Sequence, residues 1–202
     1  MGTLASLPCV ILASASPRRA DLLTAAGVTF EVRAVDVDER PFDGETAADY
    51  VVRVAADKAR ACRAATDVVI LAADTVVVVD GRILGKPVDD ADAARMLHLL
   101  SGRRHDVLTG VAVRRGGAVA VEVDSTAVTF APLSDTDIAW YVASGEPRDK
   151  AGAYAVQGLA SRFVERVDGS YSNVVGLPVA LACRMLAQAA AWQQIRLATG
   201  VE

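Results

Sequence analysis

Two neighbouring arginines follow a serine and a proline in the stretch LASASPRR at residues 12–19. Ser16 is typical of a helix N-cap and Pro17 of the first helical position, which places Arg18 and Arg19 in the first turn. Two cations are unfavourable there by about 0.3–1 kcal/mol each, because the helix dipole makes this end positive. The same end favours an anion, and arginines donate hydrogen bonds to phosphate oxygens. Taken alone, the stretch indicates a phosphate site or a surface helix with two solvated arginines equally well, and its strand–turn–helix context favours phosphate.

A carboxylate, Asp74, interrupts the apolar run VVILAADTVVVV at residues 68–79. A buried carboxylate is costly unless it contacts a cation, a metal ion or other polar groups. In such a place it could bind Mg²⁺ or accept a proton from water. The alternative is an aspartate at a strand end that hydrogen-bonds to the backbone. The length of the apolar run on both sides favours a function for Asp74.

Three further polar residues could serve such a site. Lys58 continues the apolar face of a predicted helix at helical spacing, although a lysine there usually extends its ammonium into solvent. The turn LGKP at residues 84–87 could expose Lys86, but it is no Walker A loop, because Pro87 replaces the required serine or threonine. Gln157, between strand-like residues and a glycine, could bind the edge of a base. Taken alone, the two lysines are more typical of a surface side chain and an ordinary turn.

The elements that must position these residues alternate between helix and strand early in the chain and become hairpins in the middle. Strands are expected at residues 9–13 and 29–35, within 67–84 around a tight turn at 80–81, within 105–130 around a turn at 116–117, and as short pieces around 153–167. Helices are expected from Pro17 to Gly27, from Thr46 to about residue 65, from Asp89 or Asp90 to about Ser101, from Ser134 to Gly145, and over the Ala-rich C-terminus. The pattern predicts an α/β protein with a mixed sheet.

The composition suits one compact globular domain over residues 1–202. Hydrophobic residues make up 52% of the chain, which is enough to bury a sizeable core. A net charge of −4 argues against general binding to nucleic acid or to an anionic membrane. Three cysteines without a C-x-x-C pair indicate reduced thiols rather than a zinc site or disulfides. With neither a signal peptide nor an apolar run long enough to span a bilayer, we expect a cytoplasmic protein.

Eight segments, in order and at matching spacing, together resemble the Maf family of nucleoside triphosphate pyrophosphatases. The resemblance runs from about Val10 to Pro178, nearly the whole chain, and no motif position departs from the family pattern. The segments are LASASPRR, VDVDER, YVVRVAADKA, AADTVV, LGKP, SGRRHDVLTGVAV, EPRDKAGAYAVQG and NVVGLP. One of them alone would be a weak signal, whereas all of them in sequence are specific.

The resemblance implies a fold, a reaction and a cofactor. The fold would be an elongated mixed β-sheet flanked by helices, with two lobes around a cleft, similar to inosine triphosphate pyrophosphatases. The reaction would be that of a nucleoside triphosphate diphosphatase, a hydrolase acting on acid anhydrides, which cleaves between the α and β phosphates to release the monophosphate and pyrophosphate. It would use a divalent metal ion, either Mg²⁺ or alternatively Mn²⁺ or Co²⁺. Members commonly form dimers, so the resemblance also suggests a homodimer.

The resemblance also assigns roles to individual residues of this sequence. Asp74 matches the proton acceptor proposed for the family, and Glu39 matches its acidic metal-associated residue. The phosphate-binding set is matched by Ser14, Arg18, Arg19, Lys58 and Lys86, and the DKAG segment adds Asp149 and Lys150 as substrate-binding candidates.

Three positions distinguish the branches of the family. The 7-methyl-GTP branch carries Trp, Gln and Glu where this chain has Arg18, Thr75 and Gln157, and all three residues match the dTTP/UTP branch. Thr75 and Gln157 would then hydrogen-bond a pyrimidine edge, with CTP and modified pyrimidine nucleotides as further candidate substrates. Two alternatives stay open: a nucleotide-binding regulator of cell division with negligible turnover, and an inosine or xanthosine triphosphate pyrophosphatase, in which the SPRR and DKAG segments are not expected.

Overall fold

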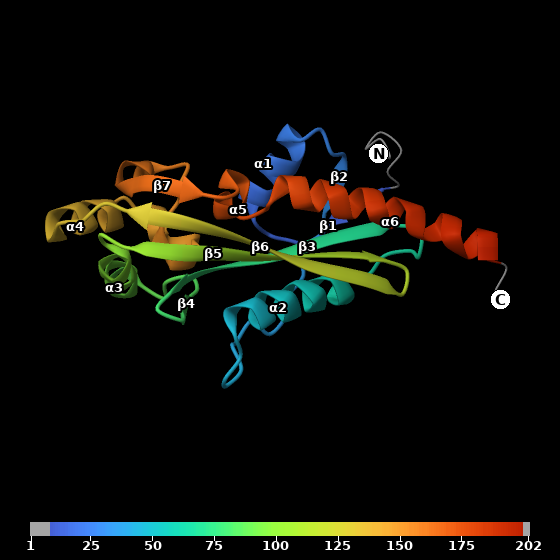
Figure 1. The fold of residues 1–202 in the computed structure, drawn as a ribbon, viewed down its shortest axis with the longest axis horizontal. Helices are drawn as coiled ribbons and strands as arrows, with labels where there is room; N and C mark the ends of the chain where they lie inside the picture. The colour runs from blue at the N-terminus through green and yellow to red at the C-terminus, as the bar shows by residue number, and fades with distance from the viewer. Residues whose placement is uncertain (1–8, 200–202) are drawn as a thin grey trace. The chain divides into compact units, whose positions relative to one another are not determined.

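The computed structural model describes residues 9–199, and side chains up to residue 192. This part of the chain contains a seven-stranded sheet in the order β2-β1-β3-β5-β6-β7, with β4 paired to β3 beside that path (Figure 1). The strands are β1 (Val10–Leu12), β2 (Phe30–Val32), β3 (Val69–Val79), β4 (Arg82–Leu84), β5 (Arg104–Arg115), β6 (Ala118–Phe130) and β7 (Val164–Asp168). β1 is parallel to β2 and β3, whereas the β3–β4 and β6–β7 pairs are antiparallel. The mixed pairing confirms the predicted α/β class.

The five predicted helices are all present, and α5 (Tyr171–Val175) and the three 3₁₀ helices named below were not predicted. The α-helices are α1 (Pro17–Ala25), α2 (Ala47–Ala61), α3 (Asp90–Leu100), α4 (Asp135–Ala143), α5 (Tyr171–Val175) and α6 (Val179–Thr199), and the 3₁₀ helices are η2 (Glu146–Asp149), η3 (Ala151–Ala153) and η4 (Leu159–Phe163). The Thr46 side chain caps α2, and Ser134 with Asp137 forms a capping box at α4. These caps satisfy backbone N–H groups that have no partner within the helix.

Two local expectations are wrong, and each has a physical cause. The helix α2 ends at Ala61 rather than near residue 65. The Arg114 guanidinium donates hydrogen bonds to the carbonyl oxygens of Ala59 and Cys62 in place of the N–H groups of a further helical turn, and Cys62 has an extended backbone conformation. Of the short strands expected around residues 153–167, only β7 forms. The backbone N–H groups that begin η4 donate to the Glu146 carboxylate instead of to a neighbouring strand.

The chain divides into two compact units. Unit 1 comprises residues 1–74, 110–124 and 176–202, and unit 2 comprises residues 75–109 and 125–175. The boundaries fall inside β3 and close to the middle of β5 and β6, so each of these long strands contributes to both units. The candidate residues are therefore divided between the units by their position in the sequence.

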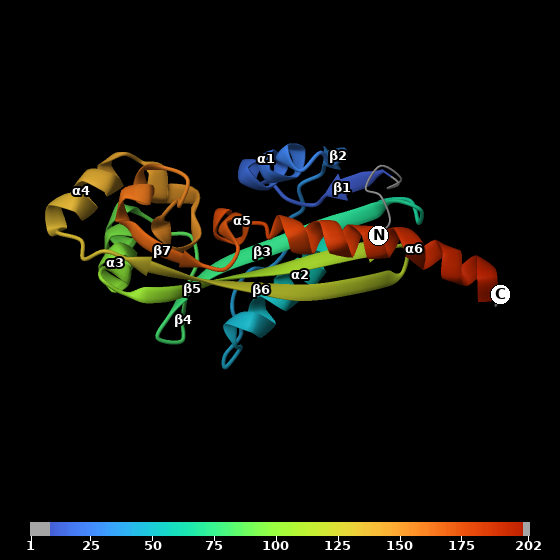
Figure 2. The same cartoon turned by 45° about the horizontal axis from the view of Figure 1, so that its top comes forward.

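Unit 1 has a sheet that is buried on both faces, with α1 and α6 on one face and α2 on the other (Figures 1 and 2). Successive residues of β1 and β3 alternate between two cores. Val10 and Leu71 pack with residues of α1 and α6, whereas Ile11 and Ile70 pack with Ala55 and its neighbours on α2. The continuous apolar runs of β1 and β3 are typical of such a doubly covered sheet.

A glycine sets how closely α2 lies on the sheet of unit 1. A Cβ atom built on Gly110 of β5 would lie 2.6 Å from the carbonyl carbon of Val51 and even closer to its oxygen. Any side chain at this position would push the helix away from the strand. Gly110 therefore fixes the position of the helix that carries Lys58.

Unit 2 has its own core, built mainly on aromatic and aliphatic residues from β3, α3, β6 and α4. His105 lies within it, with its ring edge-on to Phe130, and its Nε2 is 2.9 Å from the hydroxyl of Tyr154. Burial lowers the pKa of His105 to about 4, against a weak opposing effect of the Arg103 backbone. His105 is therefore a neutral core residue.

Candidate active site

Two buried charged candidates of unit 1, Lys58 and Asp74, form an ion pair. Lys58 Nζ lies 2.7 Å from Asp74 Oδ1 and 2.6 Å from Glu39 Oε1. The Lys58 and Asp74 residues are only 8% and 7% exposed, whereas the Glu39 side chain is 45% exposed. The ordinary expectation for Lys58, an ammonium extended into solvent, is thus wrong. So is the alternative for Asp74, because this residue lies inside β3 rather than at its end.

The position of Lys58 follows from the pattern of α2. Val51, Val54 and Ala55 lie on its buried face, and Lys58 continues that face at helical spacing. It belongs to the last turn of the helix, where the dipole favours a cation. Because α2 packs closely on the sheet, the buried face directs the ammonium towards Asp74 rather than towards water.

The Ser-Pro-Arg-Arg turn has the predicted backbone but a different set of contacts. Ser16 has the extended N-cap conformation and Pro17 begins α1, yet the Ser16 side chain forms no cap hydrogen bond. Arg19 is 8% exposed; its Nη1 donates to Ser14 Oγ at 3.1 Å and its Nε donates to the carbonyl of Gly176 at 2.8 Å. Arg18 is half-buried. Arg19 is therefore a fixed, buried guanidinium and not a solvated one.

The charges of unit 1 interact with one another. Burial lowers the pKa of Arg19, the carboxylate of Asp74 opposes that shift, the neighbouring Arg18 adds to it, and Glu39 opposes it. The two carboxylates thus lie within electrostatic reach of the α1 arginines as well as in contact with Lys58. Unit 1 therefore brings together the predicted proton acceptor, the predicted metal-associated residue and most of the predicted phosphate-binding set.

The loop that carries Glu39 is fastened to α2 by Arg53, a residue that the sequence analysis did not single out. Arg53 forms a two-pronged ion pair with Glu45, with N–O distances of 2.6 and 2.8 Å. Its guanidinium also donates to the carbonyl oxygens of Arg40 at 3.0 Å and Asp38 at 3.4 Å, on either side of Glu39. The available signal was its place in the YVVRVAADKA segment, five residues before Lys58.

Two aromatic residues complete this fastening. The Tyr50 hydroxyl donates to the carbonyl oxygen of Glu39 at 2.8 Å, and the Arg53 guanidinium lies 4.0 Å from the ring centre of Phe42. Burial raises the pKa of Tyr50 above its ordinary value, and the negative charges of Asp74 and Glu39 raise it further. The backbone of the acidic loop is therefore held at three successive carbonyl groups, which limits where the Glu39 carboxylate can go.

The candidates of unit 2 lie in different surroundings. Thr75 Oγ1 lies 2.8 Å from Oγ1 of the fully buried Thr109. Lys150 Nζ donates to Asp149 Oδ1 at 2.6 Å and to the carbonyl oxygen of Glu146 at 2.7 Å. Lys86 and Gln157 are exposed. Unit 2 thus pairs Asp149 with Lys150 and fixes Thr75 against a buried hydroxyl.

Glu146 organises the segment around Gln157, and this too was not foreseen from the sequence. Its carboxylate accepts hydrogen bonds from the Tyr141 hydroxyl at 2.8 Å, the Leu159 N–H at 3.0 Å and the Ala160 N–H at 3.3 Å. A Cβ on Gly158 would lie 2.6 Å from the Glu146 carboxyl carbon, so a side chain there would require the Glu146 carboxylate to move. The backbone beside Gln157 is therefore held by one carboxylate.

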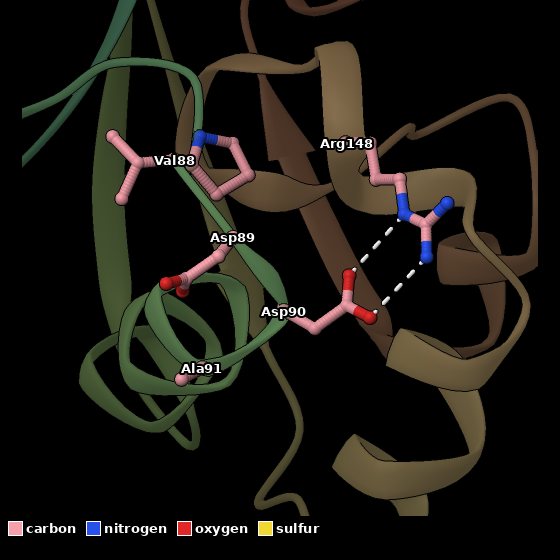
Figure 3. A pocket seen from close by; sticks show the side chains of 6 residues that line it. Val88, Asp89, Asp90, Ala91 and Arg148 are labelled. Carbon is pink, nitrogen blue, oxygen red and sulfur yellow. Dashed lines mark hydrogen bonds and ion pairs between the residues drawn. The ribbon is translucent and has the colours of Figure 1, made fainter.

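A hollow in unit 2 lies beside the Gly-Lys-Pro turn and is lined by Pro87, Val88, Asp89, Asp90, Ala91 and Arg148 (Figure 3). Arg148 and Asp90 face one another across it, at 3.2 and 3.3 Å. Each of these charges is thus paired within the hollow. None of the residues assigned to substrate by the resemblance lines it, so it is not the candidate site.

The donor set of unit 1 suits a hard divalent cation. Carboxylate oxygens are the ligands that Mg²⁺ and Mn²⁺ prefer, and Asp74 and Glu39 both already contact one cation, the ammonium of Lys58. Over residues 9–199, no group of three or more His, Cys, Asp or Glu side chains could hold a metal ion. A metal ion here would therefore need oxygens from water or from a ligand.

Among the helices within residues 9–199, none combines the length and apolarity that a membrane crossing requires.

Comparison with known proteins gives consistent matches over nearly the whole chain. The profile of the family described as Maf-like protein matches residues 9–189. A dTTP/UTP pyrophosphatase of Anaeromyxobacter dehalogenans (strain 2CP-C) is 54% identical over 194 residues, covering 93% of this chain and 98% of the relative. The dTTP/UTP pyrophosphatase of Shewanella oneidensis is 51% identical over 189 residues, covering 89% and 97%. A solved HAM1 protein from Coxiella burnetii has 17% identity and a TM-score of 0.47, covering 89% of this chain and 96% of that one.

Proposed function

Since this chain belongs to the family of Maf-like proteins, we propose that it is a nucleoside triphosphate pyrophosphatase that hydrolyses dTTP and UTP to the monophosphate and pyrophosphate. In chemical terms it would be a diphosphatase that acts on an acid anhydride. Relatives named for this activity are 54% and 51% identical over almost the full length, which supports the assignment. The observation that carries the proposal is the buried ion pair of Lys58 and Asp74, because it places a carboxylate among cations within the sheet.

The proposed proton acceptor is Asp74. Its carboxylate would take a proton from water as the water oxygen forms a bond to the α-phosphorus. The bond between that phosphorus and the oxygen bridging to the β-phosphorus then breaks, and pyrophosphate leaves with the electron pair. Most of the rate enhancement would come from positioning and electrostatic stabilisation, as in other phosphoryl transfers.

The proposed binding site for the phosphates is the start of α1 together with the end of α2. Arg19 is held by Ser14 and Gly176, so its guanidinium needs no reordering when an anion arrives. Arg18 lies beside it in the first turn, and Lys58 supplies an ammonium from the opposite face of the sheet. The arginines at the start of α1, unfavourable towards the helix dipole, would then act as donors to phosphate.

The proposed cofactor is a divalent cation, most simply Mg²⁺, with Mn²⁺ and Co²⁺ as substitutes. When bound, it would neutralise negative charge on the phosphates. Glu39 would hold it together with substrate oxygens, and the carboxylate oxygens on this loop fit such a group. Tyr50 and Arg53 keep the loop in place for this role.

The proposed base preference depends on Arg18, Thr75 and Gln157, which match the dTTP/UTP branch. We assign to Thr75 and Gln157 hydrogen bonds to a pyrimidine edge, with CTP and modified pyrimidine nucleotides as further candidates. Lys86, Asp149 and Lys150 complete the proposed substrate-binding set. We also propose that the protein is a homodimer and that it is cytoplasmic. Size-exclusion chromatography with light scattering measures the molar mass and so tests the homodimer.

The test replaces Asp74 by asparagine, which keeps an oxygen near Lys58 but cannot accept the proton. Pyrophosphate release from dTTP should fall by about 10²–10⁴-fold, while the fold is kept and nucleotide affinity stays close to that of the parent. Asp67→Asn makes the same chemical change at an exposed position shortly before β3 and serves as the matched control. Full activity of Asp74→Asn would remove Asp74 from the proposed role.

The substrate is tested with steady-state rates for dTTP, UTP, CTP and 7-methyl-GTP, each with Mg²⁺, Mn²⁺ and Co²⁺. A preference for dTTP and UTP is expected. A preference for 7-methyl-GTP would overturn the branch assignment. Tight nucleotide binding without release of pyrophosphate from any substrate would instead favour a nucleotide-binding regulator.

A further inference from the structure

One ammonium contacts both carboxylates to which the proposed function gives separate roles. Lys58 Nζ lies within 2.7 Å of an oxygen of Asp74 and of an oxygen of Glu39, on different segments of unit 1. The first is the proposed proton acceptor and the second the proposed metal-associated residue. In this state neither carboxylate is fully available, and Lys58 itself is not available to phosphate.

We propose that Lys58 acts as a resident cation that a divalent metal ion must displace, so that metal and nucleotide bind to this protein cooperatively. The inference rests on the proposed function and deepens it. Without nucleotide, the ammonium holds the two carboxylates and suppresses metal binding. With nucleotide, the phosphates offer the ammonium new partners, so that Glu39 becomes free for the metal ion and Asp74 for the attacking water.

The charges around the pair strengthen this competition. Arg19 is buried and interacts with both Asp74 and Glu39, and Arg18 stands next to it. A divalent ion that entered without a nucleotide would add positive charge to a place that already holds an ammonium and a buried guanidinium. A nucleotide brings several negative charges, so joint entry keeps the charges in balance.

The side chains also differ in their freedom to move. Lysine carries its charge on a flexible four-carbon stem with three donors, whereas the Arg19 guanidinium is fixed by hydrogen bonds to Ser14 and Gly176. The Glu39 side chain is 45% exposed, so a solvated ion can reach its carboxylate. Lys58 is therefore the cation that can be exchanged, and Glu39 is the ligand through which exchange begins.

The experiment measures Mn²⁺ binding to the nucleotide-free protein by titration calorimetry, with electron paramagnetic resonance of unbound Mn²⁺ as a second method. Lys58→Met should bind Mn²⁺ about ten- to a hundredfold more tightly than the parent, because a cation in contact with a carboxylate competes with other cations by about that factor. Lys58→Arg keeps the charge and should bind as weakly as the parent. Lys58→Gln is the substitute if Lys58→Met does not fold.

The matched control is Arg60→Met, on the same helix, which removes one positive charge from a side chain that is 61% exposed and paired with Asp57. Its Mn²⁺ affinity should stay within about threefold of the parent, as expected for a screened surface charge. Unchanged or weaker binding by Lys58→Met would overturn the proposal. Equal tightening in Lys58→Met and Arg60→Met would overturn it too, because general electrostatics would then be the cause.

This result is independent of turnover. Tighter Mn²⁺ binding by Lys58→Met, together with a parent protein that releases no pyrophosphate, would support the exchange and reject the proposed function. Pyrophosphate release by the parent without tightening in Lys58→Met would support the function and reject the exchange.

Discussion

The close approach of α2 to Gly110 of the sheet of unit 1 predicts a large effect of a small change, Gly110→Ala. The added Cβ would lie 2.6 Å from the carbonyl carbon of Val51, whereas packed carbon atoms are separated by about 3.5–4.0 Å. The contact is short by about 1 Å, and because the opposing atoms belong to the backbone, the whole helix must shift. Overpacking of this kind costs about 1–3 kcal/mol, which corresponds to a fall of about 2–12 °C in unfolding temperature for a chain of this size.

The matched control is Gly117→Ala, where an added Cβ meets nothing within 4 Å. Urea unfolding of both variants gives the free energy of unfolding, and the slope of the transition shows whether the unfolded state has changed. The control should stay within about 0.5 kcal/mol of the parent. A shift of α2 also moves Lys58 relative to Asp74, so we expect Gly110→Ala to lose about tenfold or more in pyrophosphate release. Parent-like stability of Gly110→Ala would refute this account of how α2 is placed.

Two further predictions concern the core of unit 2 and the acidic loop. The pKa of His105 is lowered to about 4 from an ordinary value of 6.5, so its contribution to the free energy of unfolding is complete above pH 6.5 and is lost as the pH falls towards 4. That loss amounts to about 3 kcal/mol. In His105→Phe, the free energy of unfolding measured with urea should therefore change less with pH over this range than in the parent. Arg53→Met should accelerate subtilisin cleavage within residues 38–45 about tenfold, because the variant loses the hydrogen bonds that hold this loop. Arg114→Met removes a guanidinium from the other end of α2 and should leave the cleavage rate unchanged. Equal acceleration in both variants would contradict the role of Arg53 in holding the loop.

Several local features could be predicted because they depend on neighbours in the sequence. The caps at Thr46 and Ser134 act over three residues, and the Asp80–Gly81 turn depends on positive φ angles that its two residues adopt at 49° and 72°. The continuous apolar runs identified β1 and β3. The segment beside Gln157 failed as a strand, because its N–H groups bind Glu146, and no sequence pattern announces that partner.

The candidate site divides in the same way. The residue types and order of the motifs were enough to name Asp74, Lys58 and Arg19, since a carboxylate in an apolar run and arginines at a helix start each require an explanation. The direction of Lys58 was not predictable, because helical periodicity determines which face a side chain occupies but not what lies opposite. The same holds for Arg53, whose partners are backbone carbonyls in a loop without regular pattern.

The amino-acid sequence by itself determined the α/β class, the starts of the five predicted helices and the identity of the chemical groups, all of which depend on short-range spacing and on the motif order. Only the tertiary structure decided which of those groups meet. Arg19 binds the carbonyl of a residue 157 positions away, and Lys58 meets Asp74 only because a glycine on β5 lets α2 lie close against the sheet. Such contacts depend on how surfaces pack, and packing is a property of several segments at once.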